Sequence, residues 1–342
     1  MHILLVKMSS MGDLLHTLPA LTDAQNAIPE LTIDWLVEPA FADIPAWHPA
    51  VANTIPLPLR QWRKNIFKTL CSGDFSNFKQ IIQSKKYDAV IDAQGLLKSA
   101  WITKLVDAHS HGFDRQSARE PLSSIFYNNK YAIDKNQHAI LRTRELFANA
   151  LNYNFPTTNP NYKIDISKLP HLNFKTPDKY LVFLHSTTWS TKQYPIEYWE
   201  NLLAKAKTDN LTVYLPWGNE TEKLRAEKLS ETHGIVLPRL SIAELATLLH
   251  KSTAVIAVDT GLGHLSAALN TPTISLYGPT NPARVGAIGA QTINLTVDFP
   301  CAPCVSKKCL YKNDAETSLK PICYSTLSPE KIWKQLKLIT NN

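Results

Sequence analysis

Hydrophobic and polar positions alternate in blocks along the first half of the chain. Short continuous apolar runs, such as residues 3–6, are typical of strands buried in a parallel sheet. Between these runs, apolar side chains recur at helical spacing, as in the leucines between residues 14 and 21. The pattern predicts strands at 3–6, 33–37 and 89–91 and helices at 14–21, 96–106 and 138–151.

The alternation lapses once and then begins again. Residues 152–179 are rich in proline, threonine and asparagine, a composition that favours turns and extended chain over helix. A last helix at 329–339 has Ser328 as its N-cap and Pro329 at its first position. The second half predicts strands at 180–184, 211–215, 254–258 and 273–276 and helices at 196–207, 221–229 and 265–269.

Two successive blocks of this kind predict an α/β fold with two Rossmann-like lobes, whose parallel sheets face a central cleft. The predicted boundaries are residues 1–155 for the first lobe, 156–178 for a linker and 179–328 for the second lobe. The C-terminal helix, residues 329–342, is expected to pack back on the first lobe. Ligands of such sheets bind at the carboxyl ends of the strands, so the loops that follow strands are where a site is expected.

Composition and charge narrow the class of protein. Of the 342 residues, 44% are hydrophobic and 19% are charged, which excludes a disordered tail or a fibre. No apolar run approaches the roughly 20 residues that cross a bilayer, and the first run is too short for a secretory signal. We therefore expect a cytoplasmic protein. The net charge of +7 is compatible with an anionic substrate or an anionic membrane face.

A polar loop, residues 7–13, follows the first predicted strand and leads into a helix. Asp13 is a candidate general base, because a carboxylate at the carboxyl end of a strand can face a bound hydroxyl. It fits the cap of that helix equally well. The loop lacks a G-x-G-x-x-G fingerprint, which disfavours a dehydrogenase.

The strongest local signal is VDTGLGH, residues 258–264, between an apolar strand and a helix of small residues. Its two glycines allow a ligand to approach the backbone, and the N–H groups that open a helix bind phosphate. A tight turn with a capping aspartate is the alternative, but it does not account for the clustering. The residues predicted to bind phosphate are Asp259, Thr260, Gly261, Gly263 and His264.

Two other loops of the second lobe carry polar side chains. Thr187, Thr188 and Lys192 follow the first strand of that lobe, where a lysine would offset the charge of a diphosphate leaving group. Alone, this loop also fits a solvated surface. Glu222 follows the next strand, and its carboxylate either accepts hydrogen bonds from ribose hydroxyls or lies in the first turn of a helix.

Cations gather in or near loops of the first lobe. Such residues often lie on a solvated face, but arginine also binds carboxylates and phosphates through paired hydrogen bonds, which suits a polyanionic acceptor. Nucleic acid is not an expected partner, since no zinc-finger, RNP-type or helix-turn-helix pattern accompanies them. The cations are Arg60, Arg63, Lys64, Lys98, Arg115 and Arg119.

Four of the five cysteines lie in one C-terminal stretch, as a C-x2-C-x4-C-x13-C array. Thiolates at such spacing can enclose a tetrahedral metal, most simply zinc, as a structural site. Four reduced cysteines in a surface segment are the alternative, because the longer spacings fit no standard zinc finger. The candidate ligands are Cys301, Cys304, Cys309 and Cys323.

Five dispersed motifs, taken together and in this order, resemble the bacterial lipopolysaccharide heptosyltransferases. The resemblance runs from residue 1 to about residue 295, and it implies a two-lobed GT-B glycosyltransferase fold. It also implies transfer of L-glycero-D-manno-heptose from ADP-heptose to Kdo of the inner core, without a catalytic metal. The motifs are VKMSSMGDLLHTLPA at 6–20, YDAVIDAQGLLKS at 87–99, AREPL at 118–122, LPWG at 215–218 and DTGLGH at 259–264.

The resemblance implies a role for each candidate. Asp13 matches the family's catalytic base, and Glu222 matches the acid at the ribose of ADP-heptose. The diphosphate contacts are Thr187, Thr188, Lys192 and the loop from Asp259 to His264. The acceptor pocket for Kdo carboxylates and lipid phosphates comprises Lys7, Arg60, Arg63, Lys64, Lys98 and Arg119. The implied partners are ADP-heptose, Kdo-lipid A and the cytoplasmic face of the inner membrane, on which the enzyme would lie peripherally.

The sequence departs from the family pattern in two places. The cysteine-bearing tail is similar to that of relatives that include those adding the second heptose, and Gln61 interrupts a basic cluster that is often longer. A structural zinc or iron is expected at the cysteines if they bind metal. The alternative functions are addition of the second heptose and a non-catalytic two-lobed protein that binds a sugar nucleotide.

Overall fold

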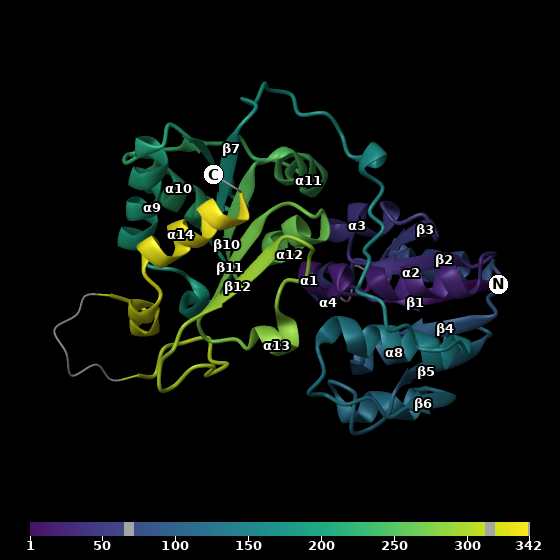
Figure 1. The fold of residues 1–342 in the computed structure, drawn as a ribbon. Coiled ribbons are helices and arrows are strands. Elements are labelled where there is room, and N and C mark those ends of the chain that lie inside the picture. The colour runs from purple at the N-terminus through teal and green to yellow at the C-terminus, as the bar shows by residue number, and fades with distance from the viewer. Residues whose placement is uncertain (65–71, 312–318, 341–342) are drawn as a thin grey trace. The chain divides into compact units, whose positions relative to one another are not determined.

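The structure, a computed structural model, describes residues 1–64, 72–311 and 319–340 and divides into two compact units, Met1–Lys168 and Leu169–Asn342 (Figure 1). The division falls within residues 156–178, the segment that the composition predicts to be a linker. Each unit contains one parallel six-stranded sheet covered by helices.

The sheet of the first unit has the strand order β3-β2-β1-β4-β5-β6. The central strand β1 pairs in parallel with β2 on one side and with β4 on the other. Parallel strands covered on both faces have to bury side chains on both, which explains the continuous apolar run at residues 3–6. The strands are β1 (His2–Val6), β2 (Thr32–Val37), β3 (Val51–Pro56), β4 (Ala89–Asp92), β5 (His109–Phe113) and β6 (Asn129–Tyr131).

Helices cover both faces of this sheet. On one face α2 lies against α8, as Figure 1 shows. On the other face, Phe78, Ile82 and Ile102 join Leu4 and Val90 in one apolar cluster. The helices are α1 (Met11–Leu15), α2 (Leu18–Ala27), α3 (Asp43–Ala46), α4 (Leu59–Lys64), α6 (Asp74–Gln83), α7 (Leu97–Thr103) and α8 (Ala139–Leu151), with 3-10 turns η1 (Pro39–Phe41), η2 (Pro121–Phe126) and η3 (Ile166–Lys168).

The sheet of the second unit repeats this plan with the order β12-β11-β10-β7-β8-β9. Its central strands β7 and β10 are fully buried, as their apolar sequences require. The strands are β7 (Tyr180–Leu184), β8 (Thr212–Leu215), β9 (Ile235–Val236), β10 (Ala254–Val258), β11 (Thr273–Tyr277) and β12 (Thr292–Thr296). The helices are α9 (Ile196–Thr208), α10 (Glu220–Ser230), α11 (Ile242–Lys251), α12 (Gly261–Ala268), α13 (Pro282–Val285) and α14 (Pro329–Ile339), with 3-10 turns η4 (Ser190–Lys192) and η5 (Ile322–Thr326).

The C-terminal helix α14 packs within the second unit. Its apolar face, formed by Ile332, Trp333 and Leu336, joins the core of that unit, and α14 lies against α9. The Nζ of Lys337 lies 2.8 Å from a carboxylate oxygen of Asp209, just after α9. The described part of the helix thus buries its apolar stripe against the second sheet. Packing of residues 329–342 on the first lobe stays a prediction.

The predicted α/β class with two parallel-sheet lobes is confirmed. Within the parts of the chain that the structure describes, no helix combines the length and the apolar character needed to cross a membrane.

Candidate functional site

Asp13 lies in the first turn of α1, directly after the loop that leaves β1. One carboxylate oxygen, Oδ2, accepts hydrogen bonds from the backbone N–H of Ser10 at 2.8 Å and from the Ser10 hydroxyl at 3.0 Å. The capping role suggested by the sequence is thus realised through this oxygen. The side chain stays half-buried at the carboxyl end of the sheet, the position that the role of a general base requires.

The charges around Asp13 favour its ionised form. Burial acts to raise the pKa of Asp13, but the Lys7 ammonium, the two Ser10 donors and the Arg119 guanidinium outweigh it, so the pKa is lowered. A carboxylate in this state accepts a proton at neutral pH.

Lys7 is buried, with 8% of its surface exposed. Its Nζ donates a hydrogen bond to the carbonyl of Ala93 at 2.8 Å, and burial lowers its pKa despite the opposing effect of Asp13 and Asp92. The ammonium therefore lies inside the loop layer and acts on Asp13, whereas the family resemblance implies a contact of Lys7 with the acceptor. That contact stays a prediction.

A side chain that the sequence analysis did not single out supports the loop of residues 8–10. The Oε1 of Gln94 accepts hydrogen bonds from the N–H groups of Met8 and Ser9, and its Nε2 donates to the Ser9 carbonyl. The N–H of Gln94 itself donates to the buried Asp92. The signal was present in the sequence, since both residues lie in the motif at 87–99, which contains β4.

The predicted acceptor cations lie on loops and helices beyond the ends of β1, β3, β4 and β5. Arg60 is exposed, and its Nε lies 3.9 Å from the carboxylate of Glu38. The backbone N–H of Glu38 donates a hydrogen bond to the carbonyl of Met8. Arg119 is exposed and close enough to influence the pKa of Asp13, while Lys98 is half-buried at the start of α7. The side chains of Arg63 and Lys64 lie outside the described residues. Arg115 is exposed in the loop after β5.

In the second unit, Lys192 and Asp259 form an ion pair. The lysine Nζ lies 2.7 Å from Oδ2 of Asp259, and the Thr280 hydroxyl donates to the same oxygen at 2.6 Å. Oδ1 of Asp259 lies 3.8 Å from Nε2 of His264. Burial acts to raise the pKa of Asp259, but hydrogen bonding to His264 and the charge of Lys192 hold it at about 2.

The glycine-bearing turn opens α12. Thr260 is its N-cap but makes no capping hydrogen bond with its side chain, an arrangement suited to an external anion at the first-turn N–H groups. A Cβ on Gly263 would lie 3.0 Å from the Cβ of Ala257, so this glycine allows α12 to approach β10. Close approach of a ligand at Gly261 remains a prediction.

The remaining residues that were predicted to bind the donor substrate lie around this turn or on α10. The Thr187 hydroxyl donates to the carbonyl of Asp259 at 3.1 Å, and Thr188 is exposed. One oxygen of Glu222 accepts the N–H of Gly218 at 2.8 Å, while the N–H of Glu222 donates to the N-cap Asn219. Glu222 therefore stabilises the turn before α10, and its contact with ribose stays a prediction.

The C-terminal segment supports the turn that carries Lys192. The hydroxyl of the fully buried Tyr324 donates to the Lys192 carbonyl at 3.1 Å. Thr191 donates to the carbonyl of Ser306, and Ser190 donates to that of Lys307 at 3.0 Å. The loop that bears the cysteines is therefore part of the scaffold of the candidate donor site.

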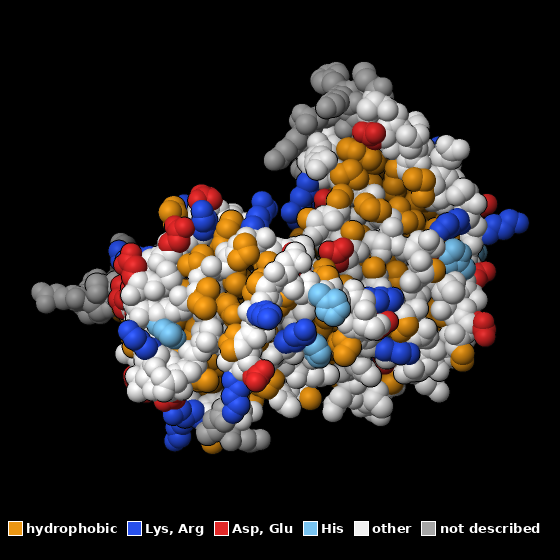
Figure 2. All heavy atoms as spheres, turned by 90° about the horizontal axis from the view of Figure 1, so that it is seen from above, with side chains coloured by type: hydrophobic (Ala, Val, Ile, Leu, Met, Phe, Trp, Pro, Cys, Tyr) orange, Lys and Arg blue, Asp and Glu red, His pale blue; other side chains and the backbone are white. Residues whose placement is uncertain are grey.

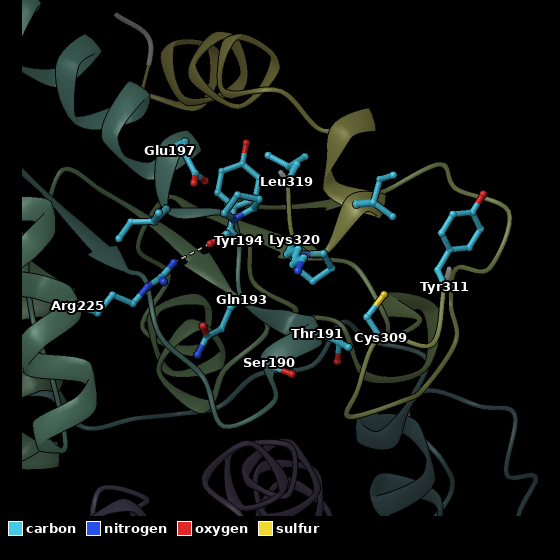
Figure 3. A pocket seen from close by; sticks show the side chains of 14 residues that line it. Ser190, Thr191, Gln193, Tyr194, Glu197, Arg225, Cys309, Tyr311, Leu319 and Lys320 are labelled. Atoms are coloured by element: carbon cyan, nitrogen blue, oxygen red, sulfur yellow. Dashed lines mark hydrogen bonds between the residues drawn. The ribbon is translucent and has the colours of Figure 1, made fainter. Parts of the chain in front are cut away.

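A cavity of about 780 Å³ lies beside this turn (Figure 3). Its described lining includes Ser190 and Thr191 of η4, the start of α9, Arg225 of α10, and residues 309, 311 and 319–322. In Figure 3 the Arg225 side chain reaches the backbone of Tyr194, whose carbonyl accepts a hydrogen bond from Nη2 at 2.7 Å. Lys192 is not among the lining residues that the structure describes. The sequence analysis did not predict this cavity.

The four C-terminal cysteines carry free thiols. Burial raises the pKa of Cys323 to about 12, and the nearby Cys301, Cys309 and Cys304 contribute to this increase. Among residues 1–64, 72–311 and 319–340, no group of three or more His, Cys, Asp or Glu side chains is arranged to hold a metal ion. The described geometry thus does not fit the predicted structural metal.

Comparisons with known proteins identify the family of the chain. Residues 75–314 match glycosyltransferase family 9 (heptosyltransferase). Lipopolysaccharide heptosyltransferase 1 of Pseudomonas aeruginosa is 50% identical over 347 residues, covering 98% of this chain and 97% of that protein.

Two solved structures of the Escherichia coli heptosyltransferase WaaC are also similar. The structure with ADP has a TM-score of 0.85 at 41% identity and covers 99% of this chain and 100% of that one. The structure with ADP-2-deoxy-2-fluoro heptose has a TM-score of 0.82 at 41% identity and covers 99% of both chains. The chain is thus a glycosyltransferase that belongs to family 9, the heptosyltransferases.

Proposed function

We propose that the chain moves L-glycero-D-manno-heptose from ADP-heptose to a Kdo residue of the lipopolysaccharide inner core, with inversion at the anomeric carbon. Relatives that match 84% to 98% of the chain and are named lipopolysaccharide heptosyltransferase 1 support this reaction. The nucleotide ligands of the similar WaaC structures support the donor. The observation that carries the proposal is the half-buried Asp13 with its lowered pKa at the end of β1.

In the proposed reaction, Asp13 takes the proton of the acceptor hydroxyl as that oxygen attacks the anomeric carbon. The bond between this carbon and the diphosphate breaks, and ADP leaves with the negative charge. Lys192 and the N–H groups that open α12 stabilise that charge, because a cation and oriented donors favour the developing anion. Glu222 is proposed to accept hydrogen bonds from the ribose hydroxyls.

The proposed acceptor is Kdo-lipid A at the cytoplasmic face of the inner membrane. Arg60, Lys98 and Arg119 are proposed to contact its carboxylates and phosphates, because their loops border the same end of the sheet as Asp13. Arg63 and Lys64 are assigned to this pocket from their place in the sequence alone.

Asp13→Asn tests the reaction. It keeps the size of the side chain and removes the base, so ADP release in the presence of Kdo-lipid A should fall at least about 100-fold. Binding of ADP, measured by calorimetry, should be unchanged. Asp74→Asn, at an exposed position on α6, is the matched control. Undiminished turnover in Asp13→Asn would exclude the base assignment.

The acceptor is tested by comparing Kdo-lipid A with a core that already carries one heptose. Turnover with the first and not with the second supports addition of the first heptose. Turnover with the heptosylated core alone would instead assign the chain to the second addition.

A structural zinc or iron at the cysteines is a separate prediction, which the described geometry does not support. Elemental analysis of protein purified without added metal tests it. Near-stoichiometric metal that is lost in Cys304→Ser would support the site. Absence of metal in the unaltered protein would leave four reduced thiols.

A further inference from the structure

Exposed apolar side chains gather on two neighbouring elements of the first unit, α7 and η2. Leu97 and Trp101 are 40% and 44% exposed on α7, and Leu122 and Ile125 are 56% and 67% exposed on η2. Residues four apart on an α-helix share one face, and so do residues three apart in a 3-10 turn. We name these four residues the α7–η2 surface.

The two elements form one structural unit. The N–H of Leu97 donates to the Glu120 carboxylate at 2.7 Å, and the N–H of Glu120 donates to the carbonyl of Gly95 at 3.0 Å. Phe75 stacks on Trp101 with ring centroids 5.7 Å apart, so the indole is held in place while part of it stays in solvent. The surface is therefore prearranged.

Cations border the α7–η2 surface. Lys104 is exposed, and its position three residues after Trp101 places it on the same side of α7. Lys98 lies at the other end of α7, and Arg119 lies just before η2. Figure 2 shows one face of the first unit, at the right of the view, on which hydrophobic side chains gather with lysine and arginine side chains near them. Tryptophan and leucine beside lysine and arginine are typical of segments that lie in the interface of an anionic bilayer.

We propose that the α7–η2 surface docks the enzyme on the anionic leaflet that holds its acceptor. This inference rests on the proposed function, because a lipid-anchored acceptor can reach Asp13 only if the neighbouring surface of the enzyme meets the bilayer. The surface is continuous with the candidate acceptor site. Arg119 is close enough to Asp13 to help lower its pKa, and it directly precedes Glu120, which binds the N–H of Leu97 on α7. Large exposed apolar groups next to a substrate site are otherwise unfavourable in water.

The test uses the full chain and vesicles of phosphatidylethanolamine with or without phosphatidylglycerol. The unaltered protein should cosediment at least about tenfold better with the anionic vesicles. Leu122→Asp combined with Ile125→Asp should weaken that binding at least about tenfold, because two carboxylates would enter the interface. The matched control is Ile166→Asp combined with Leu338→Asp, two exposed apolar positions elsewhere, and it should bind like the unaltered protein.

Activity separates docking from chemistry. The Leu122→Asp, Ile125→Asp variant should keep its kcat/KM with a deacylated, water-soluble Kdo acceptor and lose about tenfold with acceptor embedded in vesicles. Equal thermal unfolding midpoints of both double variants show that the fold is intact. Failure of every protein to use the soluble acceptor would contradict the proposed function, while vesicle binding, which needs no turnover, would still report on docking.

Two results would overturn the docking surface. One is binding of the Leu122→Asp, Ile125→Asp variant to anionic vesicles as strongly as the control. The other is loss of self-association in that variant, seen by light scattering, with vesicle binding unchanged, because the surface would then hold a second copy of the chain.

Discussion

Ser10→Ala should raise the pKa of Asp13 and thereby change the pH dependence of transfer. The hydroxyl of Ser10 donates to Oδ2 of Asp13 at 3.0 Å, and the backbone N–H of Ser10 donates to the same oxygen at 2.8 Å. The substitution removes the first hydrogen bond and leaves the second. Both bonds favour the ionised carboxylate and help to lower its pKa.

The size of the effect follows from the lost hydrogen bond. A hydrogen bond to a charged group contributes about 1.5–3 kcal/mol. Asp13 is half-buried and keeps its other donor, so we take the lower end of this range, which corresponds to a pKa increase of about one unit. Because the base must be ionised, the acid limb of kcat should move up by about one pH unit. Well above that limb, where Asp13 is ionised in both proteins, kcat should differ little.

The assay is ADP release at saturating donor and acceptor over a series of pH values. Ser10→Thr retains the hydroxyl and should restore the acid limb. Ser84→Ala removes an exposed hydroxyl that donates to Ile81 at 2.8 Å, and it serves as the control. An acid limb that stays in place in Ser10→Ala, or that moves equally in Ser84→Ala, would refute the electrostatic role of Ser10.

Three further predictions concern the second unit. Lys192→Met should raise the donor KM at least about tenfold, because the diphosphate loses its cation, and unchanged donor kinetics would contradict that role. Tyr324→Phe removes the hydrogen bond to the Lys192 carbonyl and should raise the donor KM severalfold, whereas the control Tyr198→Phe should not; equal KM values in both would exclude this support. The pKa of Asp259 is about 2 against 3.8 in the unfolded chain, so its contribution of about 2 kcal/mol is present above pH 4 and lost as pH falls through 2. Chemical unfolding at pH 5 and pH 2 should therefore show a smaller loss of stability in Asp259→Asn than in the unaltered protein, and equal losses would contradict the shift.

The continuous apolar runs in the sequence correctly predicted the central strands of both sheets. The runs at 3–6, 180–184 and 254–258 match β1, β7 and β10, because a strand covered on both faces buries nearly every side chain. The strand β5 was not predicted, since its sequence HSHGF is largely polar. Its backbone pairs with β4 and β6, and this hydrogen bonding exists only once its neighbours are in place. The leucines at 14–21 fall in two helices rather than one, α1 and α2.

The sequence alone determined the chemistry that is available at each strand end, because a motif is contiguous along the chain and parallel strands bring their carboxyl ends to one edge. It therefore indicated Asp13 and the turn at 259–264. Only the tertiary structure decided which groups meet. Lys192 and Asp259 pair across 67 positions, and Tyr324 reaches the Lys192 carbonyl across 132. Burial of Lys7 was likewise decided by packing, since the exposure and charge of a side chain depend on neighbours that are distant along the chain.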